Sequence, residues 1–122
     1  MAQEAEEANY EDAALSALAY EFSFTDHRGS ETKIKRKLRA KKLGKYEQER
    51  IDLLRRFKGE VQAEISRRQK SKYYTRSHGE FAGMKDFDRE RMAKDFAAAY
   101  PSIPERSVAR FIDFAVYIYY LR

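Results

Sequence analysis

The charged side chains of this chain are sorted by position, and this sorting limits which segments can be buried. Residues 1–26 contain seven acidic and no basic side chains, whereas residues 27–76 contain 18 basic and 6 acidic ones, a local charge of 18 − 6 = +12. Residues 77–122 contain seven of each sign. Because a charge of +12 needs a polyanion, an acidic protein or the chain's own acidic segment nearby, we expect the middle of the chain to lie at a surface.

Length and composition are sufficient for one domain with a real core. The 122 residues are 43% hydrophobic and 14% aromatic, while the charged fraction of 37% exceeds the usual value of about 25%. The chain has no cysteine, which excludes disulfides and thiolate metal sites. We expect an acidic, disordered segment at 1–8, followed by a single helical domain at 9–122.

The spacing of apolar residues predicts an all-α fold of about five helices. The chain has only two prolines, and no run of residues alternates between apolar and polar over the length of a strand. We expect helices at about 9–22, 30–44, 45–72, 86–100 and 104–121, arranged as a compact bundle with a long basic middle helix. Asn9 and Ser30 are expected as N-caps, and Gly44 as the residue that ends the second helix.

The last expected helix is the most apolar part of the chain. From Phe111 onward it is apolar on nearly every side, with Asp113 as its one acidic residue. We therefore expect it to be the spine of the bundle and the seam of a homodimer. The longest charge-free apolar run, Phe114–Leu121, is far shorter than the roughly 20 residues that span a bilayer, and the acidic N-terminal segment is unlike a secretory signal. A cytoplasmic protein without a membrane partner is expected.

The segment at 33–45 is the strongest candidate for a binding site. It has eight bases in thirteen residues, and only Ile34 and Leu38 share an apolar face, so the segment cannot be deeply buried. Phosphate binding needs several cations close together, because counterion release grows with the number of phosphates contacted. We expect this segment to bind nucleic acid or an acidic protein surface; a solvated helix neutralised by the acidic segment is the alternative. The candidate residues are Lys33, Lys35, Arg36, Lys37, Arg39, Lys41, Lys42 and Lys45.

A second basic cluster follows at 67–76, where two aromatic residues lie among cations. Interleaved rings and cations can stack bases while they hold phosphates. The same pattern arises when a loop packs two rings against a helix, and this second interpretation is favoured for the rings. The candidate residues are Arg67, Arg68, Lys70, Lys72, Tyr73, Tyr74 and Arg76.

Residues 92–112 resemble a helix-turn-helix motif. The sequence Ala93-Lys94-Asp95-Phe96 precedes a turn through Tyr100-Pro101-Ser102, and Ile103 and Val108 then occupy the usual apolar positions of the second helix. The resemblance implies that Glu105, Arg106, Ala109 and Arg110 face a DNA groove, with Arg106 and Arg110 as base readers. The turn is longer than in the motif and lacks its usual glycine. Two packed core helices joined by a capped corner are therefore the default interpretation.

Signatures of catalysis or metal binding are missing from the sequence. Asp86, Asp88 and Glu90 alternate as at the start of an EF-hand loop, but Arg91 stands where that loop needs glycine and Ala97 where it needs glutamate. The two histidines have no partner at ligand spacing, and the chain has no Gly-rich phosphate loop or nucleophile motif. We expect a protein that is not an enzyme and that has no cofactor or metal.

These observations predict a small basic helical protein associated with nucleic acid, such as a regulator, that contacts the phosphate backbone through Lys/Arg-rich helices. The alternative is a protein-interaction module. It would be an adaptor, or an inhibitor of the kind encoded by phages and mobile elements, that docks on the acidic surface of a nucleoprotein complex.

Overall fold

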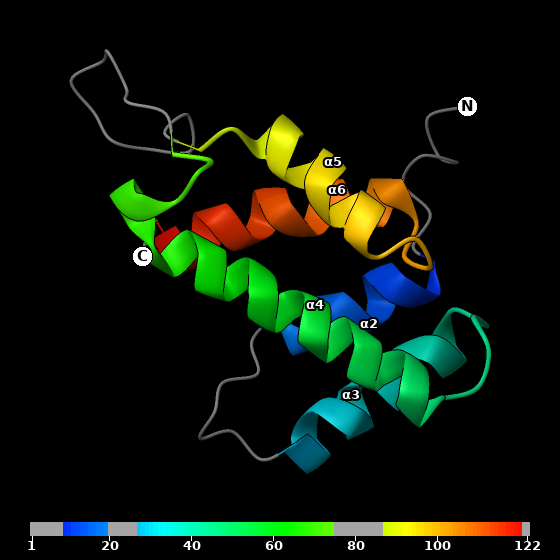
Figure 1. Cartoon of the computed structure of the whole chain (residues 1–122). Coiled ribbons are helices and arrows are strands. Elements are labelled where there is room, and N and C mark those ends of the chain that lie inside the picture. The colour runs from blue at the N-terminus through cyan, green and yellow to red at the C-terminus, as the bar shows by residue number, and fades with distance from the viewer. Residues whose placement is uncertain (1–8, 20–26, 75–86, 121–122) are drawn as a thin grey trace. The chain divides into compact units, whose positions relative to one another are not determined.

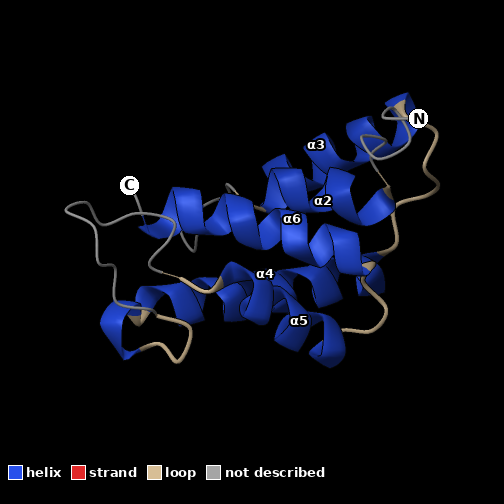
Figure 2. Cartoon of the chain, turned by 90° about the horizontal axis from the view of Figure 1, so that it is seen from above, coloured by secondary structure: helices blue, strands red, loops and turns tan. Residues whose placement is uncertain are grey.

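The computed structural model describes residues 9–19, 27–74 and 87–120, and these residues form helices joined by short loops (Figure 1). Figure 2 shows no strand in this part of the chain, where β-pairing is limited to one isolated bridge between Tyr74 and Phe87. The predicted all-α fold is confirmed. The elements are α2 (Tyr10–Leu18), α3 (His27–Ala40), α4 (Gln48–Ser66), η1 (Arg68–Lys70), α5 (Arg89–Ala99), α6 (Glu105–Ala115) and the π-helical turn η3 (Val116–Tyr120).

The structure divides into two compact units, residues 1–55 and residues 56–122. Unit 1 contains α2, α3 and the first part of α4; unit 2 contains the remainder of α4, η1, α5, α6 and η3. The expectation of a single domain at 9–122 stays a prediction. The expected disordered segment at 1–8 lies outside the described residues.

In unit 1, α2 forms where the sequence predicts a helix. The Asn9 side chain caps it, because its Oδ1 accepts a hydrogen bond of 2.7 Å from the backbone N–H of Asp12. The apolar residues Ala14, Leu15 and Leu18 are buried, and α2 packs against α3. A helix of nine residues is only marginally stable alone, so α2 depends on the burial of its apolar face for its stability.

The bounds of α3 differ from the prediction at both ends. The helix begins at His27, so Ser30 is a buried residue inside it rather than its cap. It ends at Ala40, because Lys42 has a left-handed backbone with φ of 54°. The N–H groups of Lys42 and Leu43 donate to the carbonyls of Arg39 and Leu38, the two bonds of a Schellman motif. Lys42 therefore takes the role expected of Gly44.

The helix α4 ends at Ser66, six residues before the predicted end. Arg68 has a left-handed backbone with φ of 52°, and η1 begins there. The Ser71 hydroxyl, beyond η1, donates to the Glu64 carboxylate and so ties the turn back onto α4. The helix ends where its apolar face ends. Ile65 is its last fully buried residue, and further helical turns would have no apolar side chain to bury.

The core of unit 2 is built around Phe57. Its ring lies 5.8 Å from that of Phe96, 5.4 Å from that of Tyr100 and 5.3 Å from that of Phe111, with edge or tilted geometry. Phe96 lies in the last turn of α5, Tyr100 directly follows that helix, and Phe111 lies in the second half of α6. The two helices pack against each other. Phe57 thus connects three helices of the unit.

The predicted spine helix is shared between α6 and η3. Phe111, Ile112, Val116 and Ile118 are buried within the chain, as expected for a core helix. Among the described apolar side chains of this segment, Phe114 is half-buried and Tyr117 has 55% of its surface exposed. The buried side chains are therefore covered by the chain itself, without a second subunit. The homodimer stays a prediction.

Candidate functional site

Two apolar residues hold α3 in place and turn its other sides to solvent. Ile34 and Leu38 are 0% and 1% exposed, and α3 packs against α2. Residues four apart lie on the same side of a helix, so this pair defines one narrow buried face. Lysine and arginine are almost never buried unless paired, and the remaining faces of α3 carry them.

The eight cations at 33–45 form what we call the α3 cationic surface. Seven of them are exposed and Lys37 is half-buried. Lys37 Nζ donates to Ser16 Oγ at 2.7 Å, and Lys35 Nζ lies 5.1 Å from the centre of the Tyr46 ring. Within the described ranges the other six have no ion pair with a carboxylate. These six are Lys33, Arg36, Arg39, Lys41, Lys42 and Lys45.

Glu11, the one buried acid of residues 9–19, pairs with an arginine outside this surface. Glu11 Oε2 accepts a hydrogen bond of 2.8 Å from Arg50 Nε, at the beginning of α4. Its side chain is 6% exposed, so its charge is committed to that one arginine. Glu11 therefore does not neutralise α3. Five of the seven acids of residues 1–26 lie outside the described residues, so the neutralised helix stays the alternative interpretation.

The end of α3 forms a hollow with cations on its walls. The Schellman turn leads the chain into a loop that places Tyr46 beside Lys35 of the helix. The hollow has a volume of about 350 Å³. Burial raises the pKa of the Tyr46 hydroxyl, and the Glu31 carboxylate raises it further, so the ring stays uncharged at neutral pH. The lining residues are Lys35, Leu38, Arg39, Gly44, Lys45 and Tyr46.

Only part of this arrangement has a signal in the sequence. Lys35 and Arg39 are four residues apart and so lie on the same side of α3. The approach of Lys45 and Tyr46 depends on the turn at 41–44, where Lys42 and Gly44 both have positive φ. A glycine shortly after a basic helix indicates such a return of the chain, whereas the left-handed lysine has no sequence signal.

The second basic cluster belongs to unit 2. Arg67, Arg68, Lys70 and Lys72 are exposed around η1, and Arg68 has an interaction partner. Arg76 lies outside the described residues.

The two tyrosines of that cluster are packing residues in this structure. Tyr73 is 3% exposed, and its hydroxyl donates to Asp95 Oδ2 at 2.7 Å. Its ring is also flanked by Lys72 and Arg91. Tyr74 is half-buried against the edge of Phe87, with ring centres 6.2 Å apart. A ring as buried as that of Tyr73 offers no face for a base.

The helices of the suggested helix-turn-helix form an antiparallel hairpin. Arg89, at the beginning of α5, places Nη1 3.2 Å from Asp113 Oδ1 near the end of α6, and both views show α5 and α6 running in opposite directions (Figures 1 and 2). Helices of the DNA-binding motif cross at roughly 90–120° instead, which separates these ends. Arg106 and Arg110 are exposed on α6, and Arg110 has an interaction partner.

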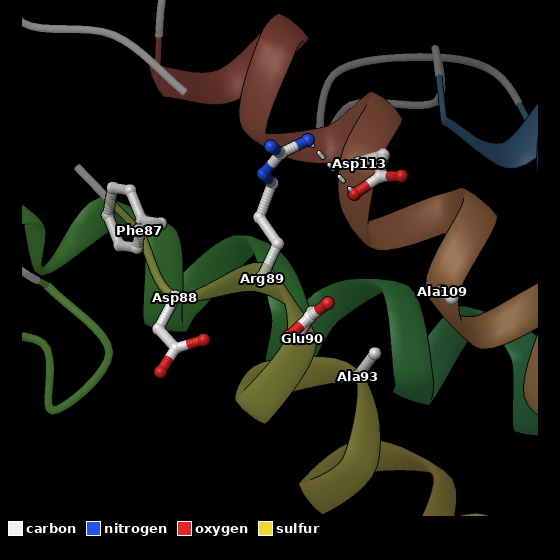
Figure 3. A pocket seen from close by; sticks show the side chains of 7 residues that line it. All are labelled: Phe87, Asp88, Arg89, Glu90, Ala93, Ala109 and Asp113. Atoms are coloured by element: carbon white, nitrogen blue, oxygen red, sulfur yellow. Dashed lines mark hydrogen bonds and ion pairs between the residues drawn. The ribbon is translucent and has the colours of Figure 1, made fainter. Parts of the chain in front are cut away.

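A hollow of about 580 Å³ lies between α5 and α6, and Figure 3 shows its walls. Ala93 and Ala109 leave room between the helices, and the Arg89–Asp113 ion pair bridges them. Asp88 accepts a hydrogen bond of 3.2 Å from the backbone N–H of Arg91 and so caps α5. These charged groups already serve the packing of the hairpin, and we assign no chemistry to the hollow.

Across the described ranges, no group of three His, Asp or Glu residues could hold a metal ion. The helices in those ranges are also too short or too polar to cross a membrane. Comparison of the chain with protein-family models, with curated proteins and with solved structures finds no match in any of the three.

Proposed function

We propose that the α3 cationic surface binds the phosphate backbone of nucleic acid. The observation that carries the proposal is the set of six exposed cations without an ion pair among the described residues, on a helix that is fixed by Ile34 and Leu38. Six phosphate contacts of this kind are sufficient for binding that weakens by about 10³-fold between roughly 50 and 200 mM salt.

The anchoring of α3 supports this function over a merely solvated helix. The eight cations in thirteen residues repel one another within the helix, so the free chain holds them close together at a cost in stability. The Glu11–Arg50 pair shows that the buried acid of the N-terminal segment is satisfied elsewhere. A polyanion would remove the repulsion and supply the missing counter-charges.

The test is a fluorescence-anisotropy titration of the full chain with labelled duplex DNA, single-stranded DNA and RNA at several salt concentrations. The variant Lys33→Gln/Arg36→Gln removes two exposed cations of the surface. We expect the slope of log affinity against log salt to become shallower by about two. The matched control Arg56→Gln/Lys94→Gln removes the same charge from exposed sites in unit 2 and should leave the slope unchanged.

Two outcomes would contradict the proposal. Affinity that stays constant between low and high salt would show that phosphates are not the ligand. If none of the three nucleic acids binds at low salt, the ligand of the surface is an acidic protein, as the interaction-module alternative requires. A pull-down would then identify that protein as one that the unchanged chain captures and the double variant does not.

A further inference from the structure

We propose that the hollow at the end of α3 takes one unstacked base of a single-stranded nucleic acid, while Lys35, Arg39 and Lys45 hold the adjacent phosphates. This inference rests on the phosphate binding proposed above and adds the form of nucleic acid that the surface prefers. The residues that carry it are those that line the hollow.

The hollow has the size and the lining of a site for a planar ring. Its volume of about 350 Å³ is at the lower end of the range of roughly 300–1,000 Å³ seen in small-ligand sites. Tyr46 contributes aromatic surface, and three cations line the hollow with it. Leu38 also lines the hollow but is only 1% exposed, so the ring of Tyr46 is the main surface on which a base could stack. A site for phosphate alone needs the cations but gains nothing from an aromatic wall.

The Tyr46 ring is the group that distinguishes a base from other anionic ligands. Its hydroxyl donates to Gln48 Oε1 at 3.2 Å, which fixes the ring at the beginning of α4. In the free protein Lys35 Nζ lies 5.1 Å from the ring centre, an arrangement that an exposed lysine leaves easily. When a base stacks on the ring, Lys35 is released to pair with a phosphate next to that base.

The backbone around the hollow is compatible with a bound strand. Gly44 has no side chain, and an added Cβ there would have no atom within 4 Å, so the backbone faces open space. The Schellman bonds occupy the carbonyls of Leu38 and Arg39, which would otherwise turn unpaired acceptors toward an anion at the end of α3.

Stacking on Tyr46 requires a strand whose bases are not already stacked on each other. In a duplex both faces of each base are covered by its neighbours, and only the edges are accessible in the grooves. Aromatic side chains therefore recognise single strands, with little dependence on sequence because every base has a flat face. A carboxylate of an acidic protein has no such face, so the ring would not contribute to binding it.

The experiment compares three labelled DNA ligands that contain a labelled strand of the same length and therefore the same number of phosphates in that strand. They are an oligo-dT strand, the same strand with abasic sites in its centre, and the dT strand in a duplex. The full chain is titrated by fluorescence anisotropy, as are the variants Tyr46→Leu and Tyr46→Phe. The Phe variant keeps the ring and loses only the hydroxyl, and circular dichroism shows that each variant is folded.

We expect the unchanged chain to prefer the dT strand over the abasic strand by about tenfold. Tyr46→Leu should abolish that preference and leave abasic binding as it was, whereas Tyr46→Phe should retain the preference. Equal binding of the dT and abasic strands, or equal loss of both in Tyr46→Leu, would overturn this inference while phosphate binding stands. No binding to any strand at low salt would overturn the inference and the proposed function together.

Discussion

Arg50 places its Nε 2.8 Å from Glu11 Oε2 and so joins the beginning of α4 to the beginning of α2. The same guanidinium lies over the Tyr10 ring, with its Cζ 3.7 Å from the ring centre. The Tyr10 hydroxyl in turn accepts a hydrogen bond of 2.9 Å from the backbone N–H of Glu47. One arginine is therefore held by a charge and by a ring from adjacent residues of α2, and this arrangement fixes α2 and the beginning of α4 to each other.

The first prediction concerns this pair. Arg50→Ala should lower the free energy of unfolding by about 1–3 kcal/mol, because it leaves the nearly buried Glu11 carboxylate without its partner. Glu11→Gln should cost less, since it also removes the buried charge. Urea unfolding followed by circular dichroism measures both, and Arg36→Ala is the control at an exposed arginine. A cost for Arg50→Ala no larger than that of Arg36→Ala would show that the pair does not stabilise the fold.

The second prediction concerns Phe57, the ring that contacts three others in unit 2. Phe57→Ala should cost about 3–5 kcal/mol, because it removes a fully buried ring and leaves a cavity among the remaining rings. Phe57→Leu fills part of that space and should cost less than half as much. Tyr117→Ala, at the exposed tyrosine of η3, should change stability by less than about 0.5 kcal/mol. Similar thermal midpoints for Phe57→Ala and Tyr117→Ala would contradict the central position of Phe57.

The features that sequence predicted well depend on neighbours in the chain. The Asn9 cap and the buried pair Ile34 and Leu38 follow from helical spacing over three or four residues, and both are confirmed. The end of α4 was predicted six residues too late because the basic residues after Ile65 are good helix formers. The absence of further apolar residues proved the better signal for that boundary.

The features that sequence missed join distant residues or depend on backbone geometry. The Arg50–Glu11 pair connects residues 39 positions apart, so no local pattern contains it. The burial of Glu11 is missed for this reason, because it depends on Arg50 of α4 packing beside α2. The hollow was missed for the same reason, since Lys45 and Tyr46 reach α3 through a turn whose left-handed residue is a lysine.

The third prediction follows from that lysine. Lys42 occupies the position of a Schellman motif that glycine normally takes, with φ of 54°. Lys42→Gly should raise the free energy of unfolding by about 0.5–1 kcal/mol, because glycine adopts this backbone without steric cost. Ala40→Gly, at the end of α3, should lower it by a similar amount, since alanine is the better residue inside a helix. Chemical denaturation of both variants measures the difference, and a loss of stability in Lys42→Gly would refute this role of the turn.

The last prediction concerns alkaline pH. Burial, together with a hydrogen bond to Glu60, raises the pKa of Tyr100 to about 12, against about 10 for an unfolded tyrosine. Above pH 10 the unfolded chain therefore loses this proton before the folded one does. The resulting stabilisation is complete below about pH 10 and is lost as the pH rises toward 12, on the order of 1–3 kcal/mol.

Tyr100→Phe cannot ionise and should show a shallower loss of stability over that range. Burial and the hydrogen bond to Asp95 also raise the pKa of Tyr73, so Tyr73→Phe should change the curve in the same direction, and the double variant should combine the two effects. Urea unfolding at a series of pH values from about 8 to 12 gives the curves, and tyrosinate absorbance reports the ionisation directly. Parallel curves for the unchanged chain and Tyr100→Phe up to pH 12 would contradict this prediction. They would show that the folded state does not raise the pKa of Tyr100, even though its ring packs against Phe57.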